Sequence, residues 1–125
     1  MVSNAGGGSS RWKNLAVTRW RSDGTRDSTG QFAYVKDLTR DRLWSAAHQP
    51  VCAPADWFQT LLATDRVTFH RADGGIETRT EVAVVPQDSA EVRRVTVTNA
   101  GDVPRDIEVT SYGEVVLAPP ESDRA

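Results

Sequence analysis

Cysteine and histidine are almost absent from this sequence. Its 125 residues include one cysteine, Cys52, and two histidines, His48 and His70. One cysteine forms no disulfide within the chain, and no His/Cys cluster has the spacing of a metal site. We therefore expect no metal or other cofactor, and a reducing compartment, the cytoplasm, as the location.

Charge of one sign and long apolar runs are lacking too. The 15 Lys and Arg and 17 Asp and Glu are mixed along the chain and give a net charge of -2. Without a basic block, nucleic acid is not an expected partner. No apolar run approaches the ~20 residues of a membrane-spanning helix, and the N-terminus lacks the regions of a secretory signal. The composition predicts one soluble globular domain.

What the sequence does contain is short strands separated by turn residues. Segments 32–37 and 42–46 flank the polar "LTRD" and predict a hairpin. Segments 66–71 and 76–85 flank "ADGG", where "DG" is predicted to supply the positive φ values of a tight turn.

Alternation within segment 76–85 predicts one face toward a core and one toward water. The predicted core face carries Ile76, Thr78, Thr80, Val82 and Val84, and the predicted water face carries Glu77, Arg79 and Glu81. Segments 91–99 and 105–117 are predicted to pair through the loop "AGDVP".

Little or no helix is expected, because no segment keeps an apolar period of about 3.6 residues behind a cap. Segment 54–63 fits a short helix or a strand about equally well. The predicted fold class is all-β, an antiparallel β-sandwich. We expect a flexible Gly/Ser-rich N-terminus over 1–14, the sandwich over 15–118, and a linker or truncation over 119–125.

The stretch from Ala16 to Asp27, "AVTRWRSDGTRD", concentrates arginine, aspartate and tryptophan. If "LAVTRW" is a strand, the following turn exposes arginines and aspartates at the rim of the sheet. Such a rim can hold a sugar, with charged groups for vicinal hydroxyls and tryptophan for the ring face. Alternatively, these arginines and aspartates pair with one another across the turn.

Other candidate features favour structure over chemistry. The run "GGGSSRW" lacks the strand, lysine and helix of a phosphate-binding loop. His70 is interpreted as a strand residue, Cys52 as a small buried apolar residue, and Trp44 and Trp57 as core. No pair of carboxylates stands out for glycosidic chemistry, so no catalytic residue is predicted.

Read in order, several segments resemble the β-supersandwich domain of cyclic β-1,2-glucan synthases. This domain, of the galactose-mutarotase-like type, precedes the (α/α)6 barrel in family 94 glycoside phosphorylases, formerly glycosyltransferase family 36. The similarity extends from about residue 6 to 121 and is carried by "SRWKNLAVTRWRSDGTRD", "GQFAYVKDL", "LWSAAHQP", "DRVTFHRADGGIETRTEVAVVPQDSAEVRRVTVTNAG" and "RDIEVTSYGEVVLAPP".

The resemblance implies a carbohydrate enzyme in which inorganic phosphate cleaves β-glucosidic bonds with inversion. The barrel carries the general acid and the phosphate-binding residues, so neither role transfers to this chain. The parent enzyme of such a domain is expected at the bacterial inner membrane when it is a glucan synthase.

Two departures from the family accompany the resemblance. The family's Asp-Trp-Gly-aromatic run is replaced by "DSTGQF" at 27–32, so a rim aromatic is missing. The family also continues past "VLAPP" into further strands, so the sandwich is predicted to be incomplete, with exposed strand edges that permit self-association.

We expect a non-catalytic domain that packs on the (α/α)6 barrel and shapes its glucan-binding cleft. The alternatives are a stand-alone carbohydrate-binding module and a structural or truncated domain without a ligand. The expected ligand is a β-glucan or oligosaccharide, and the candidate contacts are Trp12, Arg19, Trp20, Arg21, Asp23, Arg26 and Asp27.

Overall fold

The fold is all-β, as predicted, and the described part of the chain forms three antiparallel sheets and one short helix. The computed structural model describes residues 1–21 and 27–124. The elements are β1 (Arg11–Trp12), β2 (Leu15–Thr18), β3 (Gln31–Asp37), β4 (Arg42–Ser45), β5 (Trp57–Leu62), β6 (Val67–Asp73), β7 (Ile76–Val84), β8 (Glu91–Asn99), β9 (Ile107–Gly113), β10 (Val115–Ala118) and α1 (Pro120–Arg124).

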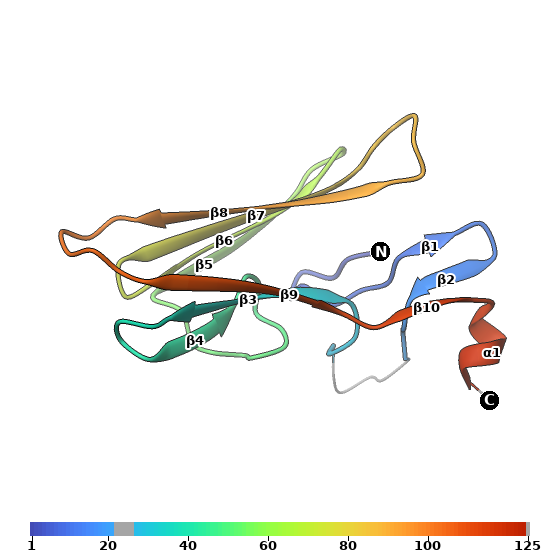
Figure 1. Cartoon of the computed structure of the whole chain (residues 1–125). Coiled ribbons are helices and arrows are strands. Elements are labelled where there is room, and N and C mark those ends of the chain that lie inside the picture. The colour runs from blue at the N-terminus through green and yellow to red at the C-terminus, as the bar shows by residue number, and fades with distance from the viewer. Residues whose placement is uncertain (22–26, 125) are drawn as a thin grey trace.

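Two of the sheets face each other as the layers of a sandwich (Figure 1). One layer has the strand order β5-β6-β7-β8 and the other β4-β3-β9. The third sheet, β1-β2-β10, lies at the opposite end of the molecule from the β8–β9 connection (Figure 1). Strands β8 and β9 each pair on one side only, so the space between the layers is open along both of them.

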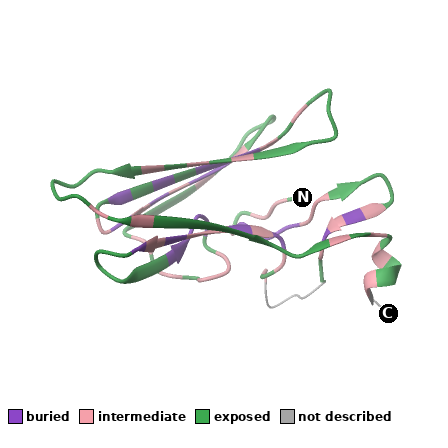
Figure 2. Cartoon of the chain, viewed as in Figure 1, coloured by how far each residue is buried: buried purple, intermediate pink, exposed green. Residues whose placement is uncertain are grey.

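The core is small and lies between the two layers (Figure 2). One cluster joins Val35 and Trp44 of the three-stranded layer to Ile76 of the four-stranded layer. The indole N–H of Trp44 donates a hydrogen bond across the layers to Thr78 Oγ1 (3.4 Å). Trp44 is therefore a core residue, as predicted, and its polar atom has a partner.

The hairpin between β6 and β7 forms as predicted, but its turn lies one residue later. Gly74 has φ 56° and Gly75 has φ 87°, whereas Asp73 is the last residue of β6 and fully buried. Two successive positive φ values suit a Gly-Gly pair, because neither residue has a Cβ.

The predicted pairing of segments 91–99 and 105–117 is wrong. Strand β8 pairs with β7 over its whole length, whereas β9 pairs with β3 in the other layer. The connection therefore crosses between the layers. Arg105, in this connection, donates to the Asp37 carboxylate at the end of β3 and to the Gly74 carbonyl at the β6–β7 turn.

Four further predictions about burial are wrong. Glu81 is 9% exposed, because Arg94 of β8 and Arg66, just before β6, cover its carboxylate, whereas Val84 is 69% exposed at the end of β7. Trp57 is 46% exposed because β5 is an edge strand. Cys52 is exposed in a loop and has φ 56°.

Residues near both ends of the chain, 1–14 and 120–124, have defined structure where the sequence predicts a mobile start and a linker. Near the start, the Gly8 amide donates to the Thr29 carbonyl (2.8 Å), and Gly6 to Gly8 are buried. Segment 120–124 forms α1, the one helix among the described residues. Segment 54–63, which the sequence left open, contains β5. The predicted boundaries at 14 and 118 stay predictions.

Candidate functional site

A cavity of about 450 Å³ lies between the β1-β2-β10 sheet and α1. Two adjacent residues of the predicted sugar-contact set, Arg19 and Trp20, line this cavity where the chain leaves β2. The sequence did not single out three other lining residues, Arg11 of β1 and Pro120 and Asp123 of α1.

Arg19 is held by two carboxylates from the C-terminal part of the chain. Its Nε donates to both oxygens of Asp123 (3.1 and 3.0 Å), and its Nη2 donates to Asp123 Oδ1 (2.8 Å). Its Nη1 donates to Glu114 Oε2 (2.9 Å). The hydrogen bond to Asp123 is the main cause that raises the pKa of Arg19, and the same bond lowers the pKa of Asp123.

Arg19 thus connects the end of β2 to α1 and closes one wall of the cavity. Arg21 lies nearby, with its Nη2 3.9 Å from Asp123 Oδ2. The described arginines of the stretch 16–27 therefore pair with the C-terminal part of the chain. The sequence had offered a sugar or the aspartates of the same stretch as partners.

Trp20 supplies the aromatic surface of the cavity and is 40% exposed. If alternation continued past β2, Trp20 would share the face of Ala16 and Thr18, which are buried at 9% and 2% exposure. Strand β2 ends at Thr18, so Trp20 lies beyond the sheet. Its side chain lines the cavity instead of packing in the interior.

The other predicted contact residues lie elsewhere. Trp12 is on β1, outside the cavity lining, with the Lys13 Nζ 4.4 Å from its ring centroid. Asp27 accepts a hydrogen bond from the Ser3 hydroxyl and lies against Gly7. Asp23 and Arg26 lie outside the described residues.

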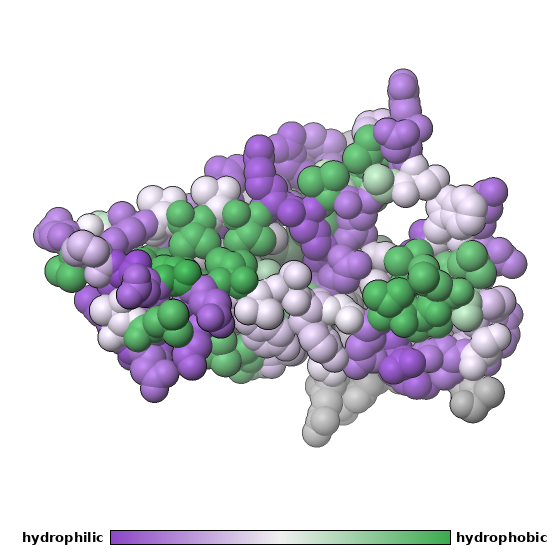
Figure 3. Space-filling view, in the orientation of Figure 1, coloured by the Kyte–Doolittle hydropathy of each residue, from purple (hydrophilic) through white to green (hydrophobic). Residues whose placement is uncertain are grey.

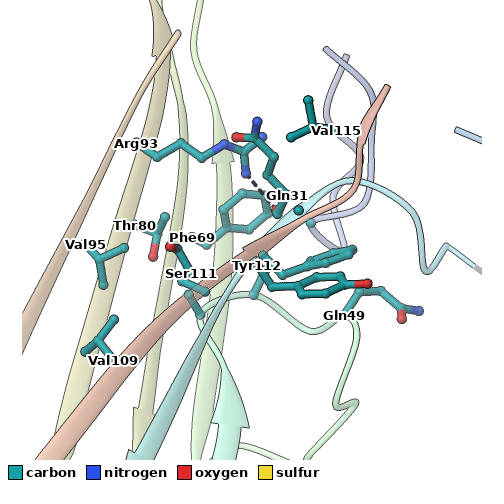
Figure 4. Close-up of a pocket in the computed structure, with 16 residues that line it drawn as sticks. Gln31, Gln49, Phe69, Thr80, Arg93, Val95, Val109, Ser111, Tyr112 and Val115 are labelled. Carbon is teal, nitrogen blue, oxygen red and sulfur yellow. Dashed lines mark hydrogen bonds between the residues drawn. The ribbon is translucent and has the colours of Figure 1, made fainter. Parts of the chain in front are cut away.

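A second cavity, of about 410 Å³, lies between the two layers of the sandwich (Figure 4). Its walls are largely apolar and include Phe69, Val95, Val109 and Tyr112. Thr80, 6% exposed, lines it too, and its Oγ1 has no hydrogen-bond partner among the described residues. Figure 3 shows that apolar side chains gather over β9 and β10 on the face of the molecule turned toward the viewer.

Comparison of the sequence with known proteins identifies the family to which this chain belongs. The profile of the family described as glycosyl hydrolase 94, supersandwich domain, matches residues 1–125, the whole chain. The chain belongs to this family. Its three antiparallel sheets agree with the all-β fold that the family name implies.

Curated relatives of this supersandwich domain are longer proteins. The cyclic beta-(1,2)-glucan synthase NdvB of Rhizobium meliloti is 37% identical over 123 residues, which are 98% of this chain and 4% of that protein. The cellobionic acid phosphorylase of Neurospora crassa is 32% identical over 83 residues, which are 66% of the chain and 10% of that protein.

The N,N'-diacetylchitobiose phosphorylase of Vibrio proteolyticus is 28% identical over 109 residues, which are 86% of the chain and 14% of that protein. The chain therefore spans between 4% and 14% of these relatives.

The linings of these two cavities differ in their carboxylates. The sandwich cavity has no carboxylate in its lining, and the Asp123 carboxylate of the other cavity is hydrogen-bonded to Arg19. Inverting glycosidic cleavage needs an acid and a nucleophile on opposite faces of the bond. Among the described residues, no group of three His, Cys, Asp or Glu is placed to hold a metal ion, and no helix is long and apolar enough to cross a membrane.

Proposed function

We propose that this chain is a non-catalytic, carbohydrate-associated domain that packs on an (α/α)6 catalytic barrel and shapes its glucan-binding cleft. The observation that carries the proposal is the match of the whole chain to the glycosyl hydrolase 94 supersandwich domain. The names of its relatives, a glucan synthase and two phosphorylases of sugar compounds, support a β-glucan or oligosaccharide as the ligand.

The cavity beside α1 supports a position at the rim of that cleft. It combines an exposed indole, Trp20, with the guanidinium of Arg11 and the Arg19–Asp123 pair. An indole offers an apolar surface to a pyranose ring, and the charged groups offer hydrogen bonds to hydroxyls. Inorganic phosphate, the co-substrate of such a phosphorylase, is assigned to the barrel. The coding sequence that continues from that of this domain, or lies next to it, should then encode a barrel; its absence from that DNA contradicts the proposal.

Replacing Trp20 by alanine in the protein that contains both domain and barrel should raise the KM for glucan about tenfold, the loss of one stacking contact. The turnover number should stay within about twofold, because the general acid lies in the barrel. Phe58→Ala is the matched control, since Phe58 is 39% exposed and Trp20 40%. A normal KM for Trp20→Ala contradicts the rim position.

The second candidate is a carbohydrate-binding module that acts alone. Titration of β-1,2-linked glucose oligosaccharides into the isolated chain should then quench tryptophan fluorescence, and Trp20→Ala should remove the effect. Absence of quenching at millimolar sugar rejects this candidate. The exposed Cys52 is compatible with the cytoplasmic location that we propose.

Self-association is a further part of the proposal, and β5 is the edge that favours it. The strand contains no charged residue and exposes Trp57, Phe58, Leu61 and Leu62 at 39% or more. Charged residues on an edge strand normally oppose pairing with another chain.

The variant Leu62→Lys should therefore shift the isolated chain toward the monomer in sedimentation experiments, because it places a charge on this edge. Leu38→Lys adds the same charge at the β3–β4 turn, at an exposed leucine outside the strands, and should leave the mass distribution unchanged. Equal distributions for wild type and Leu62→Lys contradict association through β5.

A further inference from the structure

The outer face of the four-stranded layer carries a group of side chains that no part of the proposed function uses. Antiparallel partners place Trp57 opposite Ala72, and Ala72 opposite Glu77. Side chains of directly opposed residues point to the same face of a sheet. Phe69 and Arg71 of β6 are buried in the interior, so Ala72 and its row point outward.

A second row runs parallel to the first, two residues along each strand. In it, Gln59 lies opposite His70, and His70 opposite Arg79. We call the set Trp57, His70, Glu77 and Arg79 the Trp57 platform. Two strand spacings, about 10 Å, separate Trp57 from Glu77, a span that a short oligosaccharide covers.

The indole of Trp57 is available to a ligand. It is 46% exposed, and its contact with the His70 ring is edge-to-face, with centroids 4.7 Å apart and planes at 90°. An edge-to-face contact occupies at most one face of the indole. Ala72 lies between Trp57 and Glu77 in the row and has only a methyl side chain. It therefore leaves space for a ligand between the indole and the Glu77 carboxylate.

The two charged groups of the platform have hydrogen-bonding capacity to spare. Glu77 has one ionic contact among the described residues, to His70 Nε2 at 3.9 Å, and its side chain is 49% exposed. Arg79 has one, from Nη2 to Glu81 Oε1 at 3.5 Å, and its side chain is 54% exposed. The Glu81 carboxylate is already bonded to Arg94 and Arg66. Arg19 of the predicted site has two carboxylate partners instead of one, Asp123 and Glu114.

We propose that the Trp57 platform binds a pyranose. The C–H face of the sugar stacks on the indole, while its hydroxyls donate to Glu77 and accept from Arg79. The two charges are of opposite sign and two residues apart on β7, so the platform attracts a neutral polyol and offers no net charge to a phosphate or an acidic peptide. The choice of a saccharide rests on the proposed association with carbohydrate.

Calorimetric titration of β-1,2-linked glucose oligosaccharides into the 125-residue chain tests the proposal. Trp57→Ala should weaken binding roughly tenfold, as expected for loss of a stacking contact, and Glu77→Gln should weaken it a few-fold. Phe58→Ala is the control, because Phe58 is the next residue of β5 and points to the opposite face. Circular dichroism checks that each variant folds.

Two results overturn the proposal: no heat of binding at millimolar sugar, or binding that Trp57→Ala leaves intact. Binding that depends on Trp20 and not on Trp57 rejects the platform but supports a sugar contact at the cavity beside α1. The proposed function is tested separately, because its failure would appear as the absence of a barrel-encoding sequence in the neighbouring DNA. The Trp57 platform and the proposed function are therefore tested by different measurements.

Discussion

The variant Arg71→Met is expected to lose about 3–5 kcal/mol of the free energy of unfolding, the cost of breaking a buried ion pair from one side. The Arg71 side chain is 1% exposed, and its partner Asp73 is 0% exposed. Removing the guanidinium leaves the Asp73 carboxylate in the interior without its counter-charge. Such a loss is a large fraction of the stability of a small domain.

The loss includes more than the ion pair, because each N–H of the guanidinium has an acceptor. Nε and Nη2 donate to the Asp73 carboxylate at 2.8 and 2.7 Å. The remaining N–H groups donate at 3.0 to 3.1 Å to the carbonyl of Ser45, the last residue of β4, and to those of Ala47 and Ala53 in the loop that follows. Arg71 therefore determines the path of this loop.

Urea unfolding followed by circular dichroism measures the effect, with Arg79→Met as the matched control on the exposed face. The double variant Arg71→Met/Asp73→Asn should recover part of the loss, because the unpaired charge is gone, but amide exchange in the loop 46–53 should stay fast. An unfolding free energy within about 1 kcal/mol of wild type for Arg71→Met contradicts this account.

The second large effect concerns the pair Asp37 and Arg105, which joins the two layers where β8 crosses to β9. The Asp37 and Arg105 side chains are 0% and 3% exposed. Arg105 also donates to the Gly74 carbonyl (2.8 Å), so one guanidinium connects the end of β3 to the β6–β7 turn. Asp37→Asn should cost about 3–5 kcal/mol at neutral pH, because it leaves this cation without a counter-charge.

The same pair predicts how stability depends on pH. Burial by itself raises the pKa of Asp37, but hydrogen bonds from Arg105 and from the amides of Arg40 and Thr39 outweigh it, so the pKa lies below its ordinary value of 3.8. A carboxyl group with a lowered pKa in the folded state stabilises that state above its ordinary pKa. This stabilisation is lost as the pH falls from near 4 through the lower folded value.

Unfolding free energies measured from pH 6 down to about pH 2 should therefore fall less steeply for Asp37→Asn than for wild type. Other carboxyl groups with lowered pKa values, such as Glu81 and Asp123, contribute to the slope of both proteins. Asp102→Asn, in an exposed loop, is the control and should keep the wild-type slope. Identical slopes for all three proteins reject this role of Asp37.

Local sequence patterns predicted the hairpins because turn chemistry and alternation act over a few residues. The β3–β4 and β6–β7 hairpins are where the pattern places them, and β8 spans Glu91–Asn99 as predicted. The pairing of β8 with β9 failed because adjacency in the chain does not decide which layer an edge strand joins. A buried contact between Arg105 and Asp37, 68 residues apart, accompanies that choice.

The candidate site shows the same division. The sequence pointed to Arg19 and Trp20, which do lie together at a cavity. It gave no sign of Asp123, because a partner 104 residues away leaves no local pattern. Burial of Glu81 and exposure of Trp57 were missed for a related reason: whether neighbouring strands cover a side chain depends on the order of strands in the sheet.

By itself, the sequence determined the all-β class, most strand positions and the family, since these depend on composition, period-two alternation and ordered motifs. Only the tertiary structure decided which layer each strand joins, that Arg71 and Arg105 are buried at the junctions between strands and loops, and that Trp57 faces outward beside Glu77 and Arg79. These outcomes depend on contacts between residues far apart in the chain. Such contacts stabilise the fold only after the sheets have assembled, so no local sequence pattern encodes them.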